Sequence, residues 1–349
     1  MAKRVPLTYA ASGVDVGFRA QALKGLLDAV RYRPPADHGR RVDLPGHFAG
    51  LVEIGRETIA VTTDTVGSKV MLAEALDRWE EVGEDLVAVN VNDLAAVGAR
   101  PAGLVDTILC PRPDPERFRA LGVGVDRGLR AARCALLGGE TAVVPGLVTG
   151  IDLGATAIGF FPRGRRPVTG ERIRVGDVVI GLPSTGFHAN GYTLLRRLLA
   201  EARVDLSRPR PGSRIPVGVE LLRPTRTYTT FAEAIADRPE VHGFAHLSGG
   251  GVRNLSRLHP GVAFSLDRWP TVPPVFPWAQ ALGPISDHEM FQTFNMGIGF
   301  AIVAAARRVP DLLRRLARAG ARDAVPIGTV RSGRGVRVPG FGLTYEGYA

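Results

Sequence analysis

Apolar and polar residues follow one another along this chain in patterns that predict a mixture of strands and helices. Two β-branched, apolar runs joined by a Gly-Arg-Glu turn predict a strand pair early in the chain. The first half is predicted to contain strands over residues 48–54, 58–62, 103–109, 136–141 and 151–161, and helical stretches over residues 19–30, 70–76, 84–100 and 113–132. Because strands and helices do not alternate strictly, the pattern favours an α+β fold over one doubly wound sheet.

Residues 162–174 are rich in arginine, proline and glycine, which is typical of a linker. We therefore predict two α+β domains, residues 1–165 and residues 166–349, and 349 residues are enough for two cores. The second half is predicted to contain strands over residues 177–182, 299–304 and 324–330, and helices over residues 192–200, 252–258 and 309–319.

The composition favours a cytoplasmic protein that handles small anions. The net charge is +10, but the basic residues form no long block and few aromatic residues lie among them, so nucleic-acid binding is not expected. Cys110 and Cys134 are the only cysteines, which fits a reducing cytoplasm. No apolar run reaches 18 residues, so we expect neither secretion nor a membrane span.

The segment Asp64-Thr65-Val66-Gly67-Ser68-Lys69 lies between a predicted strand and a predicted helix. A carboxylate offers hard oxygen atoms to Mg²⁺, a glycine lets backbone N–H groups approach a phosphate, and a lysine supplies positive charge. The chain has only three lysines among its 44 basic residues, which draws attention to this one. The segment lacks the Walker A pattern, and the competing interpretation is an ordinary surface turn.

Further carboxylates lie at or near the ends of apolar elements. Asn92 and Asp93 interrupt a predicted apolar helix, where both are costly to bury without a partner. The pair either faces solvent or supplies a second metal carboxylate opposite Asp64. The other acidic residues of this kind are Asp106, Glu140 and Asp152. Several such carboxylates brought together would suit a polyphosphate and its metal.

Two glycine-rich loops in the second half follow apolar segments and precede predicted helices. They are residues 183–191, with Ser184, Gly186, His188 and Asn190, and residues 246–251, with His246, Ser248, Gly249 and Gly250. Backbone N–H groups at such junctions can hold an anion. His188 either acts on a ligand or only supports its loop.

Sequence motifs in a specific order run through nearly the whole chain. They are Tyr9, Ser12-Gly13-Val14-Asp15, Asp64-Thr65-Val66-Gly67-Ser68-Lys69, Asn92-Asp93-Leu94, Gly138-Gly139-Glu140-Thr141-Ala142, Gly186-Phe187-His188-Ala189-Asn190-Gly191-Tyr192, Pro224-Thr225-Arg226, His246-Leu247-Ser248-Gly249-Gly250-Gly251, and His288-Glu289-Met290 with Thr293-Phe294-Asn295-Met296-Gly297. Each motif is weak singly, but together they resemble the phosphoribosylformylglycinamidine cyclo-ligase, or aminoimidazole ribonucleotide synthetase, family.

The resemblance implies an N-terminal α+β domain that pairs in a homodimer, its strands forming a barrel across the interface, and a C-terminal α+β domain beside it. It implies a reaction of purine biosynthesis that uses ATP and Mg²⁺. The formyl amide oxygen of formylglycinamidine ribonucleotide is activated by phosphoryl transfer. A substrate nitrogen then attacks the same carbon and phosphate leaves, which gives 5-aminoimidazole ribonucleotide and ADP.

The residues and the resemblance together assign candidate roles. Catalysis is assigned to His188, Lys69 and Asp93, and metal binding to Asp64, Asp93 and Asp106. ATP binding is assigned to Asp64, Gly67, Ser68, Lys69, Asn92, Asp93, Gly139, Glu140 and Thr141. Substrate binding is assigned to Ser184, Gly186, His188, Asn190, His246, Ser248, Gly249 and Gly250. Among the histidines, His188 ranks above His246 and His288 because its loop matches the family's Gly-x-His-x-Asn-Gly run.

Some positions depart from the family's usual pattern, and alternatives stay open. Thr65 replaces a glycine, Val143 replaces a glutamate and Gln292 replaces an arginine. Selenophosphate synthetase and the hydrogenase maturation relative would need cysteines that this chain lacks, and thiamine-monophosphate kinase lacks the 246–251 pattern. Formylglycinamidine ribonucleotide synthetase is a chemical cousin, but its single-chain form is far longer. The other alternative is a diverged paralogue that binds nucleotide without catalysis.

Overall fold

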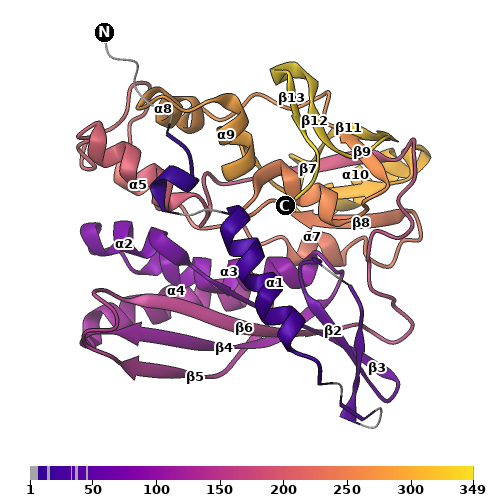
Figure 1. Ribbon diagram of the computed structural model, residues 1–349, viewed down its shortest axis with the longest axis horizontal. Helices are drawn as coiled ribbons and strands as arrows, with labels where there is room; N and C mark the ends of the chain where they lie inside the picture. Colours follow the sequence, from indigo (N-terminus) through magenta and orange to yellow (C-terminus); the bar gives the residue numbers. More distant parts are fainter. Residues whose placement is uncertain (1–6, 14–15, 33, 36–37, 45, 349) are drawn as a thin grey trace.

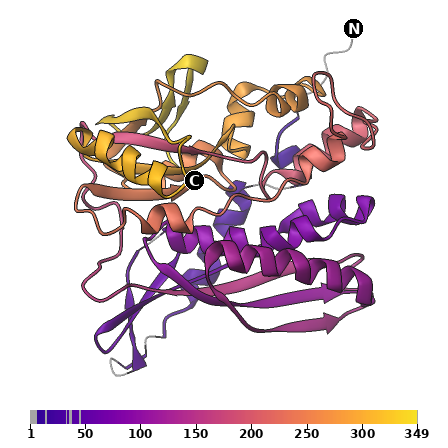
Figure 2. The same cartoon turned by 180° about the vertical axis from the view of Figure 1, so that it is seen from behind.

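The computed structural model describes residues 7–13, 16–32, 34–35, 38–44 and 46–348, and two β-sheets organise them. Figure 1 shows the two sheets one above the other, with α3 (Glu80–Ala95) and α4 (Pro115–Ala132) in the layer between them. The first half of the chain builds the lower sheet and the second half builds the upper one (Figures 1 and 2).

The first sheet has six strands in the order β1-β2-β3-β6-β4-β5. Its strands are β1 (Arg40–Val42), β2 (Gly50–Ile54), β3 (Glu57–Thr65), β4 (Arg100–Cys110), β5 (Ala135–Val143) and β6 (Asp152–Phe160). Neighbouring strands are antiparallel except for β4 and β5, which are parallel because α4 carries the chain back between them.

Helices α3 and α4 approach closely because glycines remove side chains from their contact. A Cβ atom on Gly124 would lie 1.8 Å from the carbonyl oxygen of Glu80, and one on Gly83 would lie 2.3 Å from that of Leu121. Neither distance is possible for a real side chain, so the two glycines are required for this packing. The helix pair forms a tight layer on the inner face of the first sheet.

The second sheet has seven strands in the order β13-β12-β9-β11-β7-β10-β8. Its strands are β7 (Val178–Pro183), β8 (Val241–His246), β9 (Val262–Ser265), β10 (Ile298–Ala304), β11 (Val325–Ser332), β12 (Gly335–Val338) and β13 (Leu343–Tyr345). Strand β8 lies at the edge of this sheet, yet all of its residues are buried, and α3 of the first half packs against it. The two halves therefore share a buried junction along α3.

The remaining helical elements surround these sheets. The α-helices are α1 (Val16–Ala29), α2 (Val70–Leu76), α5 (Tyr192–Glu201), α6 (Val217–Leu221), α7 (Thr229–Glu233), α8 (Val275–Ala281), α9 (Asp287–Thr293) and α10 (Val309–Arg318). Short 3-10 turns include η3 (Gly67–Lys69), which precedes α2, and η4 (Gly251–Arg257), which follows β8. No helix in the described part of the chain is both long enough and apolar enough to cross a membrane.

The predicted α+β character is confirmed, while several bounds differ from the prediction. Strand β3 continues to Thr65, so Asp64 lies within a strand and not in the loop after it. The helix predicted over 84–100 spans Glu80–Ala95, because Gly98, at φ +75°, turns the chain into β4. Helix α9, which begins after the capping residue Ser286, was not predicted. The boundary at residue 165 stays a prediction.

Part of the outer face of the first sheet is apolar and exposed. Val61 of β3 pairs with Ile158 of β6, and Val105 of β4 pairs with Thr156 of β6. Because Thr156 and Ile158 are two residues apart on β6, the side chains of Val61, Val105 and Ile158 lie on one face of the sheet. Phe160, also on β6, lies on that face, and the exposed fractions of Val61, Val105, Ile158 and Phe160 range from 36% to 45%. Ala157, on the opposite face, is fully buried. Large exposed apolar faces of this kind are typical of interaction surfaces.

Candidate active site at the junction of the two halves

Helix α3 carries two amides whose polar atoms bind backbone on either side of it. Asn90 accepts from the backbone N–H of Asp64 at 2.9 Å, which fixes the end of β3. Asn92 accepts from the backbone N–H of Tyr228 at 2.8 Å and donates to the carbonyl of Arg226 at 2.9 Å. Asn92 is fully buried, so the solvent-facing interpretation is wrong for this residue. The amide of Asn92 thus links α3 of the first half to residues 226–228 of the second half. The assignment of Asn92 to ATP binding stays a prediction.

Asp93 meets His246 across the same junction. Its Oδ1 lies 2.8 Å from His246 Nδ1, and the side chains are 14% and 1% exposed. A carboxylate accepts the hydrogen bond, so Nδ1 of the neutral ring carries the proton and Nε2 keeps its lone pair. His246 Nε2 is buried without a hydrogen-bond partner among the described residues. A histidine oriented by a carboxylate, with its second nitrogen free, is the arrangement of a general base.

Lys69 lies in the interior and not in an open loop, which corrects the sequence-based picture of its surroundings. Its Nζ is 2.7 Å from Asp85 Oδ2 and donates to the carbonyl of Arg223 at 2.8 Å, and the side chain is 0% exposed. Asp85 also accepts from the backbone N–H of Thr225 at 2.8 Å. Burial lowers the pKa of Lys69 and raises the pKa of Asp85, and the opposite charge of each partner counteracts both shifts.

The ammonium of Lys69 is therefore used in contacts within the protein. The Lys69–Asp85 pair joins η3 and α3 to residues 223–225 of the second half. Ser68 adds a contact of the same kind, because its hydroxyl and that of Thr193 on α5 share a hydrogen bond of 2.9 Å. The assignments of Gly67, Ser68 and Lys69 to ATP binding, and of Lys69 to catalysis, stay predictions.

His188, in the loop that follows β7, lies close to His246, the last residue of β8. A Cβ on Gly299 would lie 2.4 Å from His188 Cε1, and the next residue, Phe300, pairs with His246. His188 Nε2 accepts from the backbone N–H of Thr185 at 3.3 Å, so the neutral ring carries its proton on Nδ1. That Nδ1 is buried and without a partner among the residues described.

Burial, together with the nearby positive charges of Lys69 and Arg226, lowers the pKa of His188 well below its ordinary value. The imidazole is therefore neutral near pH 7. Its backbone lies in the left-handed region at φ +61°, which is uncommon for a residue other than glycine. The site thus holds a free N–H donor on His188 and a free lone pair on His246.

The loop that carries His188 is held by Asn295. Its side chain donates to the carbonyl of Gly186 at 2.8 Å and accepts from the hydroxyl of Ser184 at 2.9 Å. The backbone N–H of Ser184 also donates to the carbonyl of Gly297 at 2.9 Å. Ser184 and Gly186 therefore make structural contacts here, and their assignment to substrate binding stays a prediction.

A cavity of about 350 Å³ lies beside the second glycine-rich loop. The residues that line it include Tyr9, Asn190, Gly249, Gly250, Arg253, Gln292 and Tyr348. No acceptor among the described residues takes the backbone N–H of Gly249 or Gly250. Gly250 has φ +119°, and a Cβ there would lie 2.8 Å from the Tyr348 ring, so the position requires glycine. Of the predicted substrate residues, Asn190, Gly249 and Gly250 thus line a real cavity.

Arg253 is the cation of this cavity. Its guanidinium lies 5.9 Å from the centre of the Tyr348 ring, and its Nε is buried without a hydrogen-bond partner in the described part of the chain. Burial lowers the pKa of Arg253, against the effects of Tyr348, Tyr345 and Glu289, but a guanidinium stays charged at neutral pH. Two free backbone N–H groups and an arginine make this a suitable place for a phosphate.

The remaining predicted ATP and metal residues lie elsewhere on the first sheet. Gly139, Glu140 and Thr141 lie within the exposed strand β5 and not beyond its end. Asp106 packs over Gly139, where a Cβ would lie 1.6 Å from its Oδ1, and burial raises the pKa of Asp106. No three His, Cys, Asp or Glu side chains among the described residues could hold one metal ion by themselves. The assignment of Asp64, Asp93 and Asp106 to metal binding stays a prediction.

Several residues of the site were missed by the sequence analysis. Asp85 follows a run of glutamates that suggests a solvated helix start, and Arg253 is one of many arginines. Tyr348 belongs to the last residues of the chain, where its hydroxyl donates to the carbonyl of Gly249 at 3.3 Å. Asn254 donates to the carbonyl of His246 at 2.9 Å. The only signal in the sequence was the rarity of lysine, which drew attention to Lys69 and so to its contact with Asp85.

Comparisons with known proteins show the family of this chain. Residues 46–161 match the family model of the AIR synthase related protein, N-terminal domain, and residues 174–340 match that of the C-terminal domain. A phosphoribosylformylglycinamidine cyclo-ligase of Methanothermobacter thermautotrophicus is 43% identical over 326 residues, 93% of this chain and 94% of that protein. The chain belongs to the phosphoribosylformylglycinamidine cyclo-ligase family.

Other members of the cyclo-ligase family and more distant structures extend the likeness. The Thermococcus kodakarensis protein of the same name is 38% identical, with 97% of this chain and 99% of that protein covered. Among solved structures, AaThiL complexed with AMPPCP and TMP has a TM-score of 0.65 at 16% identity, and 99% of both chains is covered. A hydrogenase maturation protein HypE has a TM-score of 0.60 at 16% identity, with coverage of 90% and 94%. These two structures show the fold alone.

Proposed function

We propose that the chain converts formylglycinamidine ribonucleotide and ATP to 5-aminoimidazole ribonucleotide, ADP and phosphate, in purine biosynthesis. The observation that carries this proposal is the Asp93–His246 pair beside His188, which offers a proton acceptor and a proton donor in one buried site. Relatives that share the name of this activity are 35% to 43% identical. They favour an enzyme over a paralogue that only binds nucleotide.

The two free nitrogens suit the two chemical needs of ring closure. After the formyl amide oxygen takes the terminal phosphoryl group of ATP, a substrate nitrogen attacks the formyl carbon and must lose a proton. His246 Nε2, oriented by Asp93, takes that proton. His188 Nδ1–H donates to the oxygen on which negative charge develops, and the carbon–oxygen bond breaks as phosphate leaves.

The ATP and its metal are proposed on the first half, as the motifs at Asp64 and Glu140 suggest. AaThiL complexed with AMPPCP and TMP, which shares this fold, supports nucleotide use. No three acidic, histidine or cysteine side chains among the described residues form a metal site by themselves, so Mg²⁺ would be held jointly by carboxylates and the phosphates of ATP. Both histidines are buried, so we expect the loop that carries His188 and the loop that follows His246 to move when substrate enters.

The experiment that tests this function follows 5-aminoimidazole ribonucleotide formed from formylglycinamidine ribonucleotide and MgATP. Wild-type protein is expected to turn over, and His188→Gly is expected to lower kcat by roughly 10²–10⁴ because a positioned donor is lost. Glycine accepts the left-handed backbone at this position, so the fold should persist. Melting temperature and ATP affinity serve as controls.

No product from wild type would overturn the proposed function. A kcat within a few-fold of wild type in His188→Gly would remove His188 from the chemistry and leave His246 as the main candidate. Loss of activity through unfolding would appear in the melting temperature and would be assigned to the fold.

The substrate's ribose phosphate is proposed to bind Arg253 and the free N–H groups of Gly249 and Gly250. Arg253→Gln should therefore raise the KM for formylglycinamidine ribonucleotide by about tenfold or more, while the KM for ATP changes little. Arg322→Gln, at an exposed position without a recorded ion pair in the described structure, is the matched control. Equal increases in both KM values would show that the cavity does not discriminate between the two ligands.

A homodimer is proposed to cover the apolar outer face of the first sheet. The family resemblance adds that the strands of two subunits form a barrel, and the exposed side chains at Val61, Ile158 and Phe160 support a second copy as the occupant. Light scattering should give a dimer for wild type at micromolar concentration. Ile158→Glu should give a monomer, and Val325→Glu, equally exposed at 37% but on the second sheet, should stay dimeric. A monomeric wild type would contradict the proposal.

A further inference from the structure

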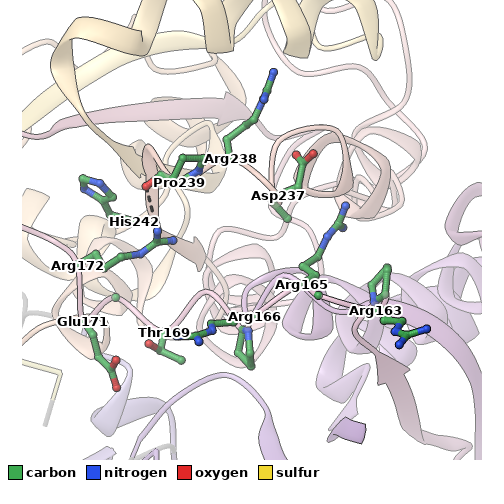
Figure 3. Close-up of a pocket in the computed structure, with 15 residues that line it drawn as sticks. Arg163, Arg165, Arg166, Thr169, Glu171, Arg172, Asp237, Arg238, Pro239 and His242 are labelled. Atoms are coloured by element: carbon green, nitrogen blue, oxygen red, sulfur yellow. Dashed lines mark hydrogen bonds between the residues drawn. The ribbon is translucent and has the colours of Figure 1, made fainter. Parts of the chain in front are cut away.

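A second cavity, of about 540 Å³, lies where the segment between the two sheets meets the corner after α7. Residues 162–172 form one wall, and residues 236–239 with His242 form the other. Figure 3 shows Arg172 and His242 on one side of this cavity, with Arg163 and Arg165 on the other. None of its lining residues also lines the cavity at Arg253.

Positive charge dominates the walls of this cavity. Five arginines line it, namely Arg163, Arg165, Arg166, Arg172 and Arg238, against two carboxylates, Glu171 and Asp237. The salt bridges recorded for the described residues include none of these seven side chains. In addition, Arg165 Nη1 is buried and has no hydrogen-bond partner in the described part of the chain. A buried guanidinium nitrogen without an acceptor is costly unless a ligand supplies one.

The walls are held in place by contacts that do not neutralise this charge. Arg172 donates to the carbonyls of Pro239 at 3.0 Å and Val241 at 2.9 Å, which are uncharged acceptors. The backbone N–H of Val168 donates to the carbonyl of Val97 at 2.9 Å, which fixes the segment to the end of α3. Gly170, at φ +88°, passes so close to Leu258 that a Cβ would lie 2.3 Å from its carbonyl oxygen. The backbone of the segments that carry these arginines is therefore held in place by contacts within the protein.

We propose that this cavity binds a small anion with several phosphate groups, at a site separate from the active site. Planar guanidinium groups match phosphate oxygens in pairs, and several of them around one cavity suit more than one phosphate. The volume lies within the usual range of ligand pockets and exceeds the needs of a single phosphate. Nucleic acid is the less suitable occupant, because no Phe, Tyr or Trp among the lining residues offers a surface for stacking bases.

Such an anion would bridge the segment between the sheets and the corner of the second half. Because it binds the folded protein, it should raise the melting temperature as its concentration rises. Exposed parts of the cavity make the binding sensitive to salt, so affinity should fall as ionic strength increases.

Titration calorimetry with inorganic tripolyphosphate tests the proposal on the full chain. Wild type is expected to bind one tripolyphosphate per chain at this cavity, and Arg165→Gln with Arg166→Gln should weaken that binding by about tenfold or more. Arg56→Gln with Arg322→Gln removes the same charge at exposed positions elsewhere and should leave binding unchanged. Arg253→Gln should also keep it, which separates this cavity from the active site. Circular dichroism confirms that each variant is folded.

Three results would overturn the proposal. The first is absence of saturable binding to wild type, and the second is undiminished binding to the Arg165/Arg166 double variant. The third is tighter binding of a single-stranded oligonucleotide that depends on the same two arginines, which would assign the cavity to nucleic acid. If Arg253→Gln loses tripolyphosphate binding while the Arg165/Arg166 double variant keeps it, the anion binds in the active site and the proposal is wrong, as in the second result.

Discussion

The buried ion pair between Lys69 and Asp85 is the contact on which the junction of the two halves depends. Both side chains are 0% exposed, and their remaining polar contacts go to Arg223 and Thr225 of the second half. Removing one partner of such a pair leaves a buried charge without compensation, which usually costs about 3–5 kcal/mol. The pair therefore fixes where α3 lies relative to the second sheet.

Helix α3 supplies the polar side chains that organise the candidate site at this junction. Along one short stretch it supplies Asn90, which holds the end of β3, Asn92, which holds residues 226–228, and Asp93, which orients His246. Polar side chains in a buried helix are unfavourable unless each finds a partner, and here each does. Because the three lie within one turn of helix, a shift of α3 would disturb the strand, the junction and His246 together.

The sequence was sufficient for the fold class, for most strands and helices, and for the loops that carry His188 and His246. It also singled out Asn92 and Asp93, because an amide and a carboxylate within an apolar helix need an explanation. It could not supply their partners, since His246 lies 153 residues from Asp93 and only tertiary packing joins them. The same limit explains Lys69. Its rarity indicated importance, but nothing local distinguishes a lysine that binds phosphate from one that pairs with a buried aspartate.

The measurement that tests this account most directly is a double-mutant cycle on Lys69 and Asp85, read as the free energy of unfolding and as ATP affinity. Lys69→Met and Asp85→Leu are each predicted to lose about 3–5 kcal/mol, and the double variant is predicted to recover most of that loss. Arg127→Met, which breaks an exposed contact with Glu80, should cost about 1 kcal/mol or less. A stable Lys69→Met protein that has lost its affinity for ATP would contradict the account and make Lys69 a phosphate ligand.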